Sequence, residues 1–161
     1  MKLRNMTSVY LTGDKGILCL YRVGSRVANN KYIGSAGGHF EPEELNDPKK
    51  CVLREMYEEL GLTEADVEGM TLRYITLRRM EGEVRQNYYF FARLKEERQL
   101  QSTEGRLEWI APEQFETLEM PLTAKHMIHH YLREGQFTDT LYGGITAQDR
   151  TIFIPLTEFE G

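Results

Sequence analysis

Residues 37–62 of the sequence read GGHFEPEELNDPKKCVLREMYEELGL. The middle of this stretch has the marks of a helix that begins and ends sharply. Asp47 is a favourable N-cap, Pro48 suits the first helical position, and Gly61 is a common terminating residue. The sequence therefore predicts a helix from Pro48 to Leu60.

This helix is expected to be amphipathic, with acid on one flank. At about 100° per residue, Glu55, Glu58 and Glu59 fall within a single arc. A separate arc is apolar and should pack against a sheet; it consists of Val52, Leu53, Met56 and Leu60.

Clustered carboxylates on a helix need a reason. Like charges three or four residues apart cost a helix about 0.2–0.5 kcal/mol per pair, and Arg54 offsets this only partly through Glu58. A solvated surface is the common reading of such a run. Against it stand Gly37 and Gly38, which permit close backbone approach. Hard divalent cations such as Mg²⁺ prefer oxygen ligands and also bind phosphate, so a metal site is the alternative.

Taken together, GGHFEPEE and REMYEELGL resemble the Nudix box, whose pattern is G-x5-E-x7-R-E-U-x-E-E-x-G-U with U a bulky aliphatic residue. Gly38 and Glu44 fit the first spacing, and residues 54–62 fit the second half position by position. Nine residues, rather than seven, separate Glu44 from Arg54. The difference indicates a two-residue insertion before the helix cap and a different path for the loop of Glu44.

The resemblance implies an α/β/α sandwich with a mixed sheet, formed by residues 1–161 as a single Nudix hydrolase domain. The residue pattern agrees, since β-rich runs precede and follow the first helix. We expect a second helix over residues 123–134, and residues 151–156 are either a last strand or an extended tail. The expected strands are 7–12, 16–23, 71–79, 87–94 and 107–110.

By the same resemblance, the site holds Mg²⁺, with Mn²⁺ as an alternative. Arg54 is expected to orient Glu55, and Glu55 to assist in activating water. The implied metal ligands are the Gly37 carbonyl and the carboxylates of Glu44, Glu55, Glu58 and Glu59.

Residues outside the box are weighed against ordinary structural roles. Arg22, at the end of a strand, is a candidate for binding substrate phosphates or a surface arginine. Glu104 resembles an acidic residue that follows the box in several members of the Nudix family and acts there as a base or an extra metal ligand. The alternative is a solvated loop residue. Tyr89 is a candidate for stacking a base, although core packing is the simpler interpretation. The histidines of residues 126–130 lack an acidic third ligand and are expected to be ordinary helix residues.

Composition narrows the function classes. The chain has 161 residues, 40% hydrophobic and 28% charged, with a formal net charge of −5. Such a charge disfavours a nucleic acid polymer as partner, because backbone binding needs a basic surface. No apolar run is long enough for a signal peptide or a membrane span, so the protein is expected to be cytoplasmic and without a membrane partner.

The predicted function is Mg²⁺-dependent hydrolysis of a diphosphate bond in a small-molecule nucleotide. A nucleoside triphosphate, such as the oxidised nucleotide 8-oxo-dGTP, would give a nucleoside monophosphate and pyrophosphate, as in the MutT-like branch. The alternatives are an ADP-ribose or nucleotide-sugar pyrophosphatase and a catalytically silent nucleotide-binding module. The base preference, the phosphorus attacked and the oligomeric state stay open.

Overall fold

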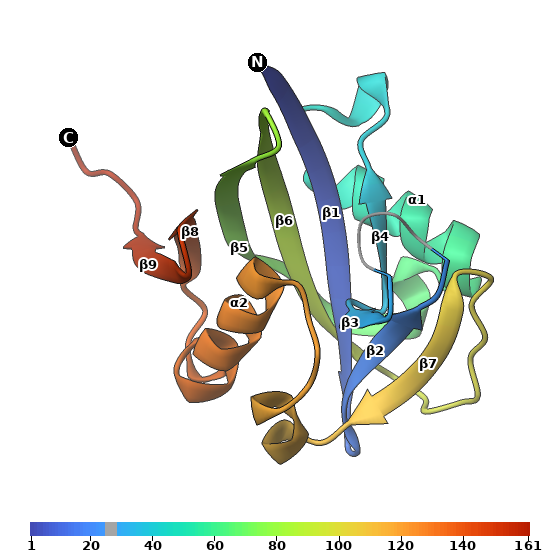
Figure 1. Ribbon diagram of the computed structural model, residues 1–161. Coiled ribbons are helices and arrows are strands. Elements are labelled where there is room, and N and C mark those ends of the chain that lie inside the picture. The colour runs from blue at the N-terminus through green and yellow to red at the C-terminus, as the bar shows by residue number, and fades with distance from the viewer. Residues whose placement is uncertain (25–28) are drawn as a thin grey trace.

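The computed structural model describes residues 1–24 and 29–161. Its elements are nine strands and two α-helices in these residues, joined in part by short 3₁₀ turns (Figure 1). The helices are α1 (Pro48–Leu60) and α2 (Leu122–Arg133). The strands are β1 (Lys2–Gly13), β2 (Gly16–Arg22), β3 (Lys31–Ile33), β4 (Ala36–His39), β5 (Val67–Met80), β6 (Glu83–Leu94), β7 (Gly105–Ile110), β8 (Leu141–Ala147) and β9 (Arg150–Leu156).

The strands form one sheet with the order β3-β2-β1-β6-β5-β8-β9, to which β4 adds beside β1 and β7 beside β2. The pairs β1–β6 and β5–β8 are parallel, and the other strand pairs are antiparallel. The sheet is therefore mixed, as predicted.

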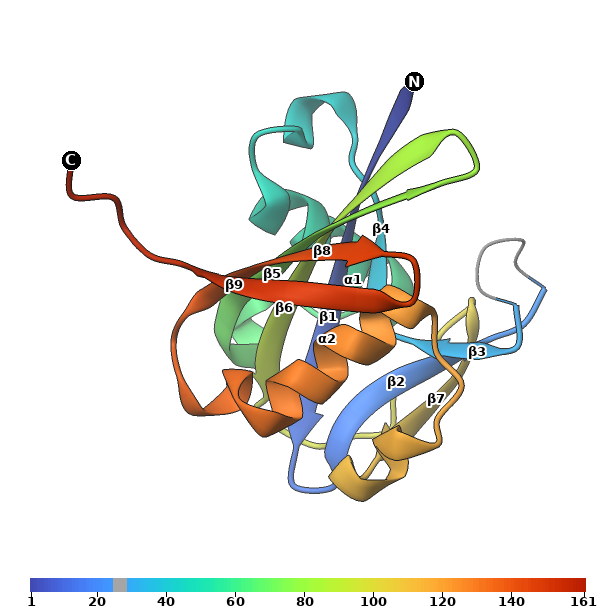
Figure 2. The same cartoon turned by 60° about the vertical axis from the view of Figure 1, so that its left-hand side comes forward.

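The two helices cover opposite faces of this sheet (Figures 1 and 2). Side chains alternate along β6, so Tyr89 and Phe91 join the core under α2, whereas Phe90 and Ala92 join the core under α1. Both faces of the central strands are thus buried. The arrangement confirms the predicted α/β/α sandwich.

Helix α1 has the predicted ends, and its capping explains why. The side chain of Asp47 accepts a hydrogen bond from the backbone N–H of Lys50 at 3.1 Å. At the other end, Gly61 adopts a left-handed conformation with φ of 70°, and its N–H bonds the carbonyl of Tyr57. These contacts are local in sequence, which is why the start and end of the helix could be predicted.

The chain after α2 departs from expectation. Residues 141–147 form β8, a strand that the sequence pattern did not predict, whereas residues 151–156 lie in β9 and so adopt the strand, one of the two alternatives expected for them. Glycines disfavour strands, but at Gly144 a Cβ atom would lie 2.8 Å from the ring of Phe153. Close packing therefore requires glycine there. None of the helices in the described residues has the length and apolar character needed to cross a membrane.

Candidate active site

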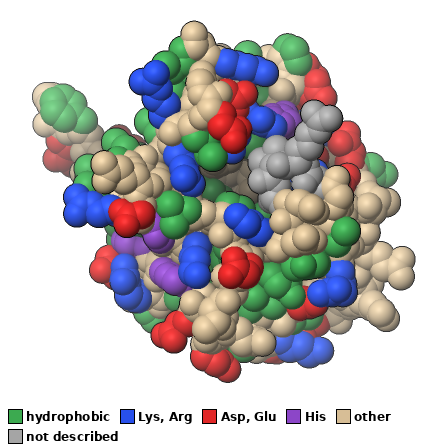
Figure 3. All heavy atoms as spheres, in the orientation of Figure 1, with side chains coloured by type: hydrophobic (Ala, Val, Ile, Leu, Met, Phe, Trp, Pro, Cys, Tyr) green, Lys and Arg blue, Asp and Glu red, His purple; other side chains and the backbone are tan. Residues whose placement is uncertain are grey.

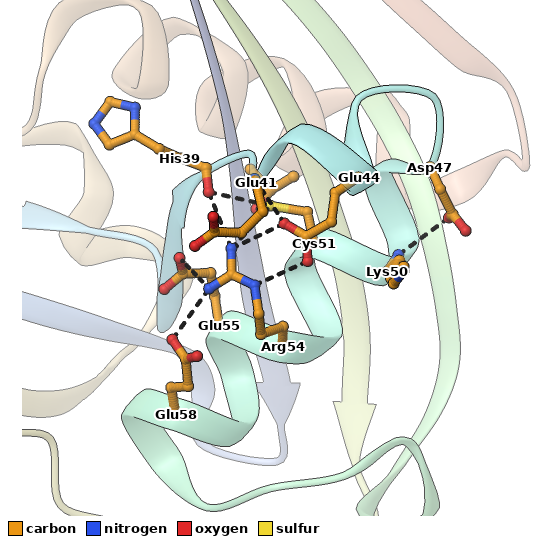
Figure 4. Close-up of polar contacts among 10 residues, drawn as sticks. His39, Glu41, Glu44, Asp47, Lys50, Cys51, Arg54, Glu55 and Glu58 are labelled. Atoms are coloured by element: carbon orange, nitrogen blue, oxygen red, sulfur yellow. Dashed lines mark hydrogen bonds and ion pairs between the residues drawn. The ribbon is translucent and has the colours of Figure 1, made fainter.

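Arg54 is the centre of the polar network on the flank of α1 (Figure 4). Its Nε donates to Glu44 Oε2 at 2.8 Å and its Nη2 donates to Glu44 Oε1 at 2.9 Å, a two-pronged ion pair. The side chain of Glu44 is only 1% exposed. The hydrogen bonds from Arg54 lower the pKa of Glu44 to about 2, with help from a backbone N–H and against the effect of burial. Glu44 is thus a buried, charged anchor for the guanidinium.

A short 3₁₀ turn brings Glu44 to this position. The turn spans Pro42–Glu44, and the backbone N–H of Glu41 donates to Glu44 Oε1 at 2.9 Å. The carbonyl of Glu44 then accepts from the N–H of Asp47 at 2.8 Å, just before α1 begins. The chain between Glu44 and Arg54 therefore accommodates nine residues while the two side chains still meet.

The other donors of Arg54 face the acidic flank of the helix. Nη1 donates to Glu55 Oε1 at 3.0 Å and to Glu58 Oε2 at 3.1 Å, and Nη2 donates to the carbonyl of His39 at 3.1 Å. One arginine thus links three carboxylates and the end of β4. The guanidinium is held on every side, because its fork of donors is fully used.

Glu59 is placed differently from these carboxylates. Its Oε2 accepts a hydrogen bond of 2.8 Å from the backbone N–H of Gly37. Within residues 1–24 and 29–161, no basic side chain lies within ion-pair distance of it. Burial raises the pKa of Glu59 to about 7. Burial also raises the pKa of Glu55, although Arg54 opposes that rise. Among the residues that the structure describes, Glu59 is thus a partly buried carboxylate without an ion-pair partner.

The two glycines of β4 leave room for this arrangement. A Cβ atom on Gly38 would lie 2.5 Å from Glu55 Oε1, and one on Gly37 would lie 2.2 Å from the carbonyl oxygen of Thr7. The contact at Gly37 is with backbone and leaves no room for a side chain, whereas the contact at Gly38 would require the carboxylate of Glu55 to move. The glycines therefore let the strand lie directly against β1 and against the carboxylate of Glu55.

A hard divalent cation fits this donor set, which offers carboxylate oxygens and backbone carbonyls close to an unbalanced negative charge. The donors do not form a closed cage. Among the described residues, no three acidic, histidine or cysteine side chains converge closely enough to hold a metal by themselves. Glu58 bends toward Arg54 and is 56% exposed. A metal bound here would need further ligands, such as water or substrate oxygens.

Arg22 and Glu104 approach the same region from β2 and from the loop before β7. Nη2 of Arg22 and Oε2 of Glu104 are 3.5 Å apart. Both charges act on Glu59: the charge of Glu104 raises the pKa of Glu59, and the charge of Arg22 lowers it. The structure thus brings together Glu59, Arg22 and Glu104, three of the residues singled out in the sequence.

Tyr89 is separated from this group. It is 5% exposed and lies in the core under α2, with its ring 6.3 Å from that of Tyr10. A ring enclosed in this way has no free face to offer a base. The candidate site therefore does not include the base-stacking contact expected of Tyr89.

Two contributors to the network carry no sequence signal. The carbonyl of His39 accepts from Arg54, and Sγ of Cys51 lies 3.3 Å from Thr7 Oγ1 and 3.9 Å from Arg54 Nη2. Any residue type has a carbonyl, and burial raises the pKa of Cys51 to about 11, so it acts as a neutral packing group.

Comparisons with known proteins bear on the family and the fold of the chain. The family model of the NUDIX domain matches residues 2–131. No curated protein matches the chain. Among solved structures, the MutT protein from Bacillus halodurans is 24% identical with a TM-score of 0.64, covering 94% of this chain and 97% of its own.

Two further structures show the same fold. A MutT protein from Methanosarcina mazei Go1 is 19% identical with a TM-score of 0.65, covering 83% of this chain and 95% of its own. An Ap4A hydrolase from C. elegans, solved as a binary complex, is 14% identical with a TM-score of 0.63, covering 81% and 95%.

Proposed function

Because the chain belongs to the Nudix family of hydrolases, we propose that it hydrolyses a diphosphate bond in a nucleoside triphosphate with the help of Mg²⁺. The first candidate substrate is an oxidised deoxynucleotide such as 8-oxo-dGTP, cleaved to a nucleoside monophosphate and pyrophosphate. The observation that carries the proposal is Glu59, a partly buried carboxylate beside Gly37 with no basic partner in the described residues.

The proposed metal ligands are the Gly37 carbonyl, Glu55, Glu58 and Glu59. Glu44 is assigned a different role, because Arg54 and the Glu41 N–H already engage both of its oxygens. When bound, the metal neutralises phosphate oxygens and lowers the pKa of water. The chain itself must then position the proton acceptor and the phosphates.

Proton removal from the attacking water is assigned to a carboxylate. Arg54 engages Oε1 of Glu55. In the described residues no hydrogen bond reaches Oε2 of Glu55, so that oxygen is free to accept a proton. Glu104 is the second candidate, because its charge acts on Glu59. Arg54 contributes by holding Glu55 in place, anchored in turn by Glu44.

Phosphate binding is assigned to Arg22. Its ion pair with Glu104 is long, at 3.5 Å, and both side chains are about one-third exposed or more. Exposed pairs of this kind contribute little to stability. A phosphate oxygen can therefore replace Glu104 as the partner of Arg22 at small cost.

A small nucleotide suits the surface better than a polymer does. The formal net charge is −5. On the face seen in Figure 3, basic and acidic side chains are interspersed and form no continuous basic stripe. Nucleic acid backbones require such a stripe. The proposal treats residues 1–161 as one domain, which the unbroken sheet from β3 to β9 supports.

The test is a product analysis. Purified protein with Mg²⁺ is incubated with the four dNTPs, 8-oxo-dGTP, ADP-ribose, a nucleotide sugar and Ap4A, and the products are identified by chromatography. We expect monophosphate and pyrophosphate from a triphosphate. Cleavage of ADP-ribose or a nucleotide sugar alone would favour those alternative substrates.

Two other outcomes contradict the proposal more deeply. Nucleotide binding without turnover of any compound would indicate a silent module, a reading that the intact set of glutamates disfavours. Undiminished turnover in excess chelator would rule out the metal-dependent mechanism, because carboxylates alone repel a polyphosphate.

A further inference from the structure

The hairpin of β8 and β9 lies beyond the part of the chain that the family model matches, which ends at residue 131. Within the described residues, β9 is the last strand of the sheet and pairs with β8. Figures 1 and 2 show the hairpin at the side of the sheet away from α1. Its outer backbone edge is therefore available for pairing with another strand.

One face of this hairpin is apolar and exposed. Ile145 pairs across the hairpin with Ile152, and Leu141 with Leu156. Exposure is 55% for Ile145, 57% for Ile152, 54% for Ile154 and 48% for Leu156. Alternate residues of β9, including Phe153, pack instead toward α2. We call the exposed set Ile145, Ile152, Ile154 and Leu156 the outer apolar face.

Neither α1 nor α2 covers the outer apolar face, and these are the α-helices of the described residues. Helix α1 lies on the same side of the sheet but contacts β4 and β1, which are separated from the hairpin by β6 and β5. An exposed aliphatic face beside a free strand edge is unusual in a monomer, because natural edge strands are commonly protected by charge. Residues 151–157 of this edge carry no charged side chain, and the protection in this run is limited to one proline, Pro155.

The charged residues that flank this uncharged run favour a second copy of the chain as the partner. Arg150 precedes it and Glu158 follows it. If a second β9 lies antiparallel, about a two-fold axis at Ile154, Arg150 stands opposite the partner's Glu158. In the same register Ile152 stands opposite the partner's Leu156. The run is thus complementary to itself in both charge and side-chain character.

We propose that a second copy of this chain binds through β9, antiparallel and centred on Ile154, so that two sheets join into one and the two outer apolar faces become continuous. Pro155 has no N–H to donate, so the backbone ladder across the axis is incomplete. The apolar side chains and the two symmetry-related pairs of Arg150 with the partner's Glu158 must therefore supply most of the attraction.

The central test is the mass of the full chain in solution as a function of concentration, by sedimentation or light scattering. Wild-type protein is expected to dimerise. Ile154→Lys places two like charges beside the axis and should raise the dimer dissociation constant about 100-fold or more. Leu45→Lys is the matched control, since Leu45 is equally exposed, at 55%, and lies before α1. It should leave the dimer unchanged.

Charge exchange tests the register. Arg150→Glu and Glu158→Arg should each weaken the dimer by about five- to tenfold, as expected of partly exposed ion pairs. The double exchange should restore it. Failure of the double variant to recover would overturn the Ile154-centred register.

Three outcomes overturn the proposal itself. They are a wild-type mass that stays monomeric at every concentration, a dimer that persists in Ile154→Lys, and a mass that grows beyond the dimer. Melting curves confirm that each variant is folded. Because the hairpin is remote from Glu59, Ile154→Lys should retain nucleotide hydrolysis, and the dimer can fail without affecting the proposed function.

Discussion

The two helices lie on opposite faces of one sheet, and their polar side chains differ in how fully they are paired within the protein. On α2, each histidine has a partner within the protein. His126 Nδ1 lies 2.8 Å from a threonine hydroxyl, His129 Nε2 lies 3.1 Å from a backbone carbonyl, and His130 Nδ1 lies 2.7 Å from the hydroxyl of Tyr74. These side chains are satisfied where they stand.

On the side of α1, the carboxylates as a group are less completely paired than the histidines of α2 are. Glu44, Glu55 and Glu58 share the one guanidinium of Arg54, and the hydrogen bond that Glu59 accepts in the described part of the chain comes from a backbone N–H. Buried polar groups are normally paired, which is why we propose Glu59 as part of a ligand site. We therefore expect the polar residues under α2 to stabilise the fold and Glu59 on α1 to serve the proposed ligand site, and the following variants test this difference.

The largest effect is expected from Arg54→Gln, which leaves the buried charge of Glu44 without its partner. Breaking a buried pair in this way costs about 3–5 kcal/mol. Urea denaturation should show a matching decrease in the free energy of unfolding. Arg93→Gln is the control, because its pair with Asp14 is exposed and should change stability by less than about 1 kcal/mol. Equal losses in the two variants would show that burial of Glu44 does not matter.

Acid should reveal the same pair in the wild-type protein. The pKa of Glu44 is lowered to about 2 in the folded state, so its stabilisation is complete above the ordinary glutamate pKa and is lost as pH falls through about 2. At roughly 1.4 kcal/mol per pKa unit, about 3 kcal/mol is involved. Unfolding free energies measured between pH 6 and pH 2 should therefore fall more steeply for wild type than for Glu44→Gln. Parallel curves would contradict the lowered pKa.

Activity should depend most on Glu59. Glu59→Gln keeps the size and helix propensity of the side chain but removes the charge that attracts a cation. We expect kcat/KM to fall about 10²-fold or more, equivalent to roughly 2.7 kcal/mol of transition-state stabilisation. The variant should stay folded by circular dichroism and lose any Mg²⁺-dependent rise in melting temperature.

The control for Glu59 is Glu64→Gln. Glu64 is 56% exposed and pairs with Lys49, just beyond the helix. It should leave kcat/KM unchanged. Wild-type rates in both variants would make the acidic flank of α1 an ordinary surface.

The smallest effect is expected from a substitution in the core under α2. Tyr74→Phe removes the hydroxyl that pairs with His130 and should lower the free energy of unfolding by about 1–2 kcal/mol, since a buried hydrogen-bonding group loses its partner. Hydrolysis rates should not change. Tyr57→Phe, at an exposed position of α1, should be neutral in both measurements. A loss of activity in Tyr74→Phe would erase the distinction between the two faces.

The sequence predicted what local chemistry determines. Both ends of helix α1 were predicted correctly, because Asp47, Pro48 and Gly61 act within one turn of their own positions. Strand β8 was missed, because Gly143 and Gly144 are poor strand formers and the close packing that requires Gly144 is against Phe153, a later residue.

The candidate site likewise has one part that the local sequence predicts and one part that only the folded chain assembles. The acidic arc of α1 follows from helical periodicity, whereas the pairing of Arg22 with Glu104 joins residues 82 positions apart. Only the finished sheet brings those two together, so local patterning could not reveal the contact. Burial of Tyr89 is likewise a result of packing α2 on the sheet, which alternation along one strand cannot predict.

The parallel pairing of β1 with β6 also sets an order for folding. Its register joins segments about 80 residues apart, from Lys2 with Glu83 to Thr12 with Arg93. Such high contact order slows folding, because a long loop must close before its contacts are made. Helix α1 lies within that loop, and the apolar surface that it needs includes Phe90 of β6. On a ribosome, the helix of the candidate site therefore emerges early but cannot dock until the chain has grown past β6.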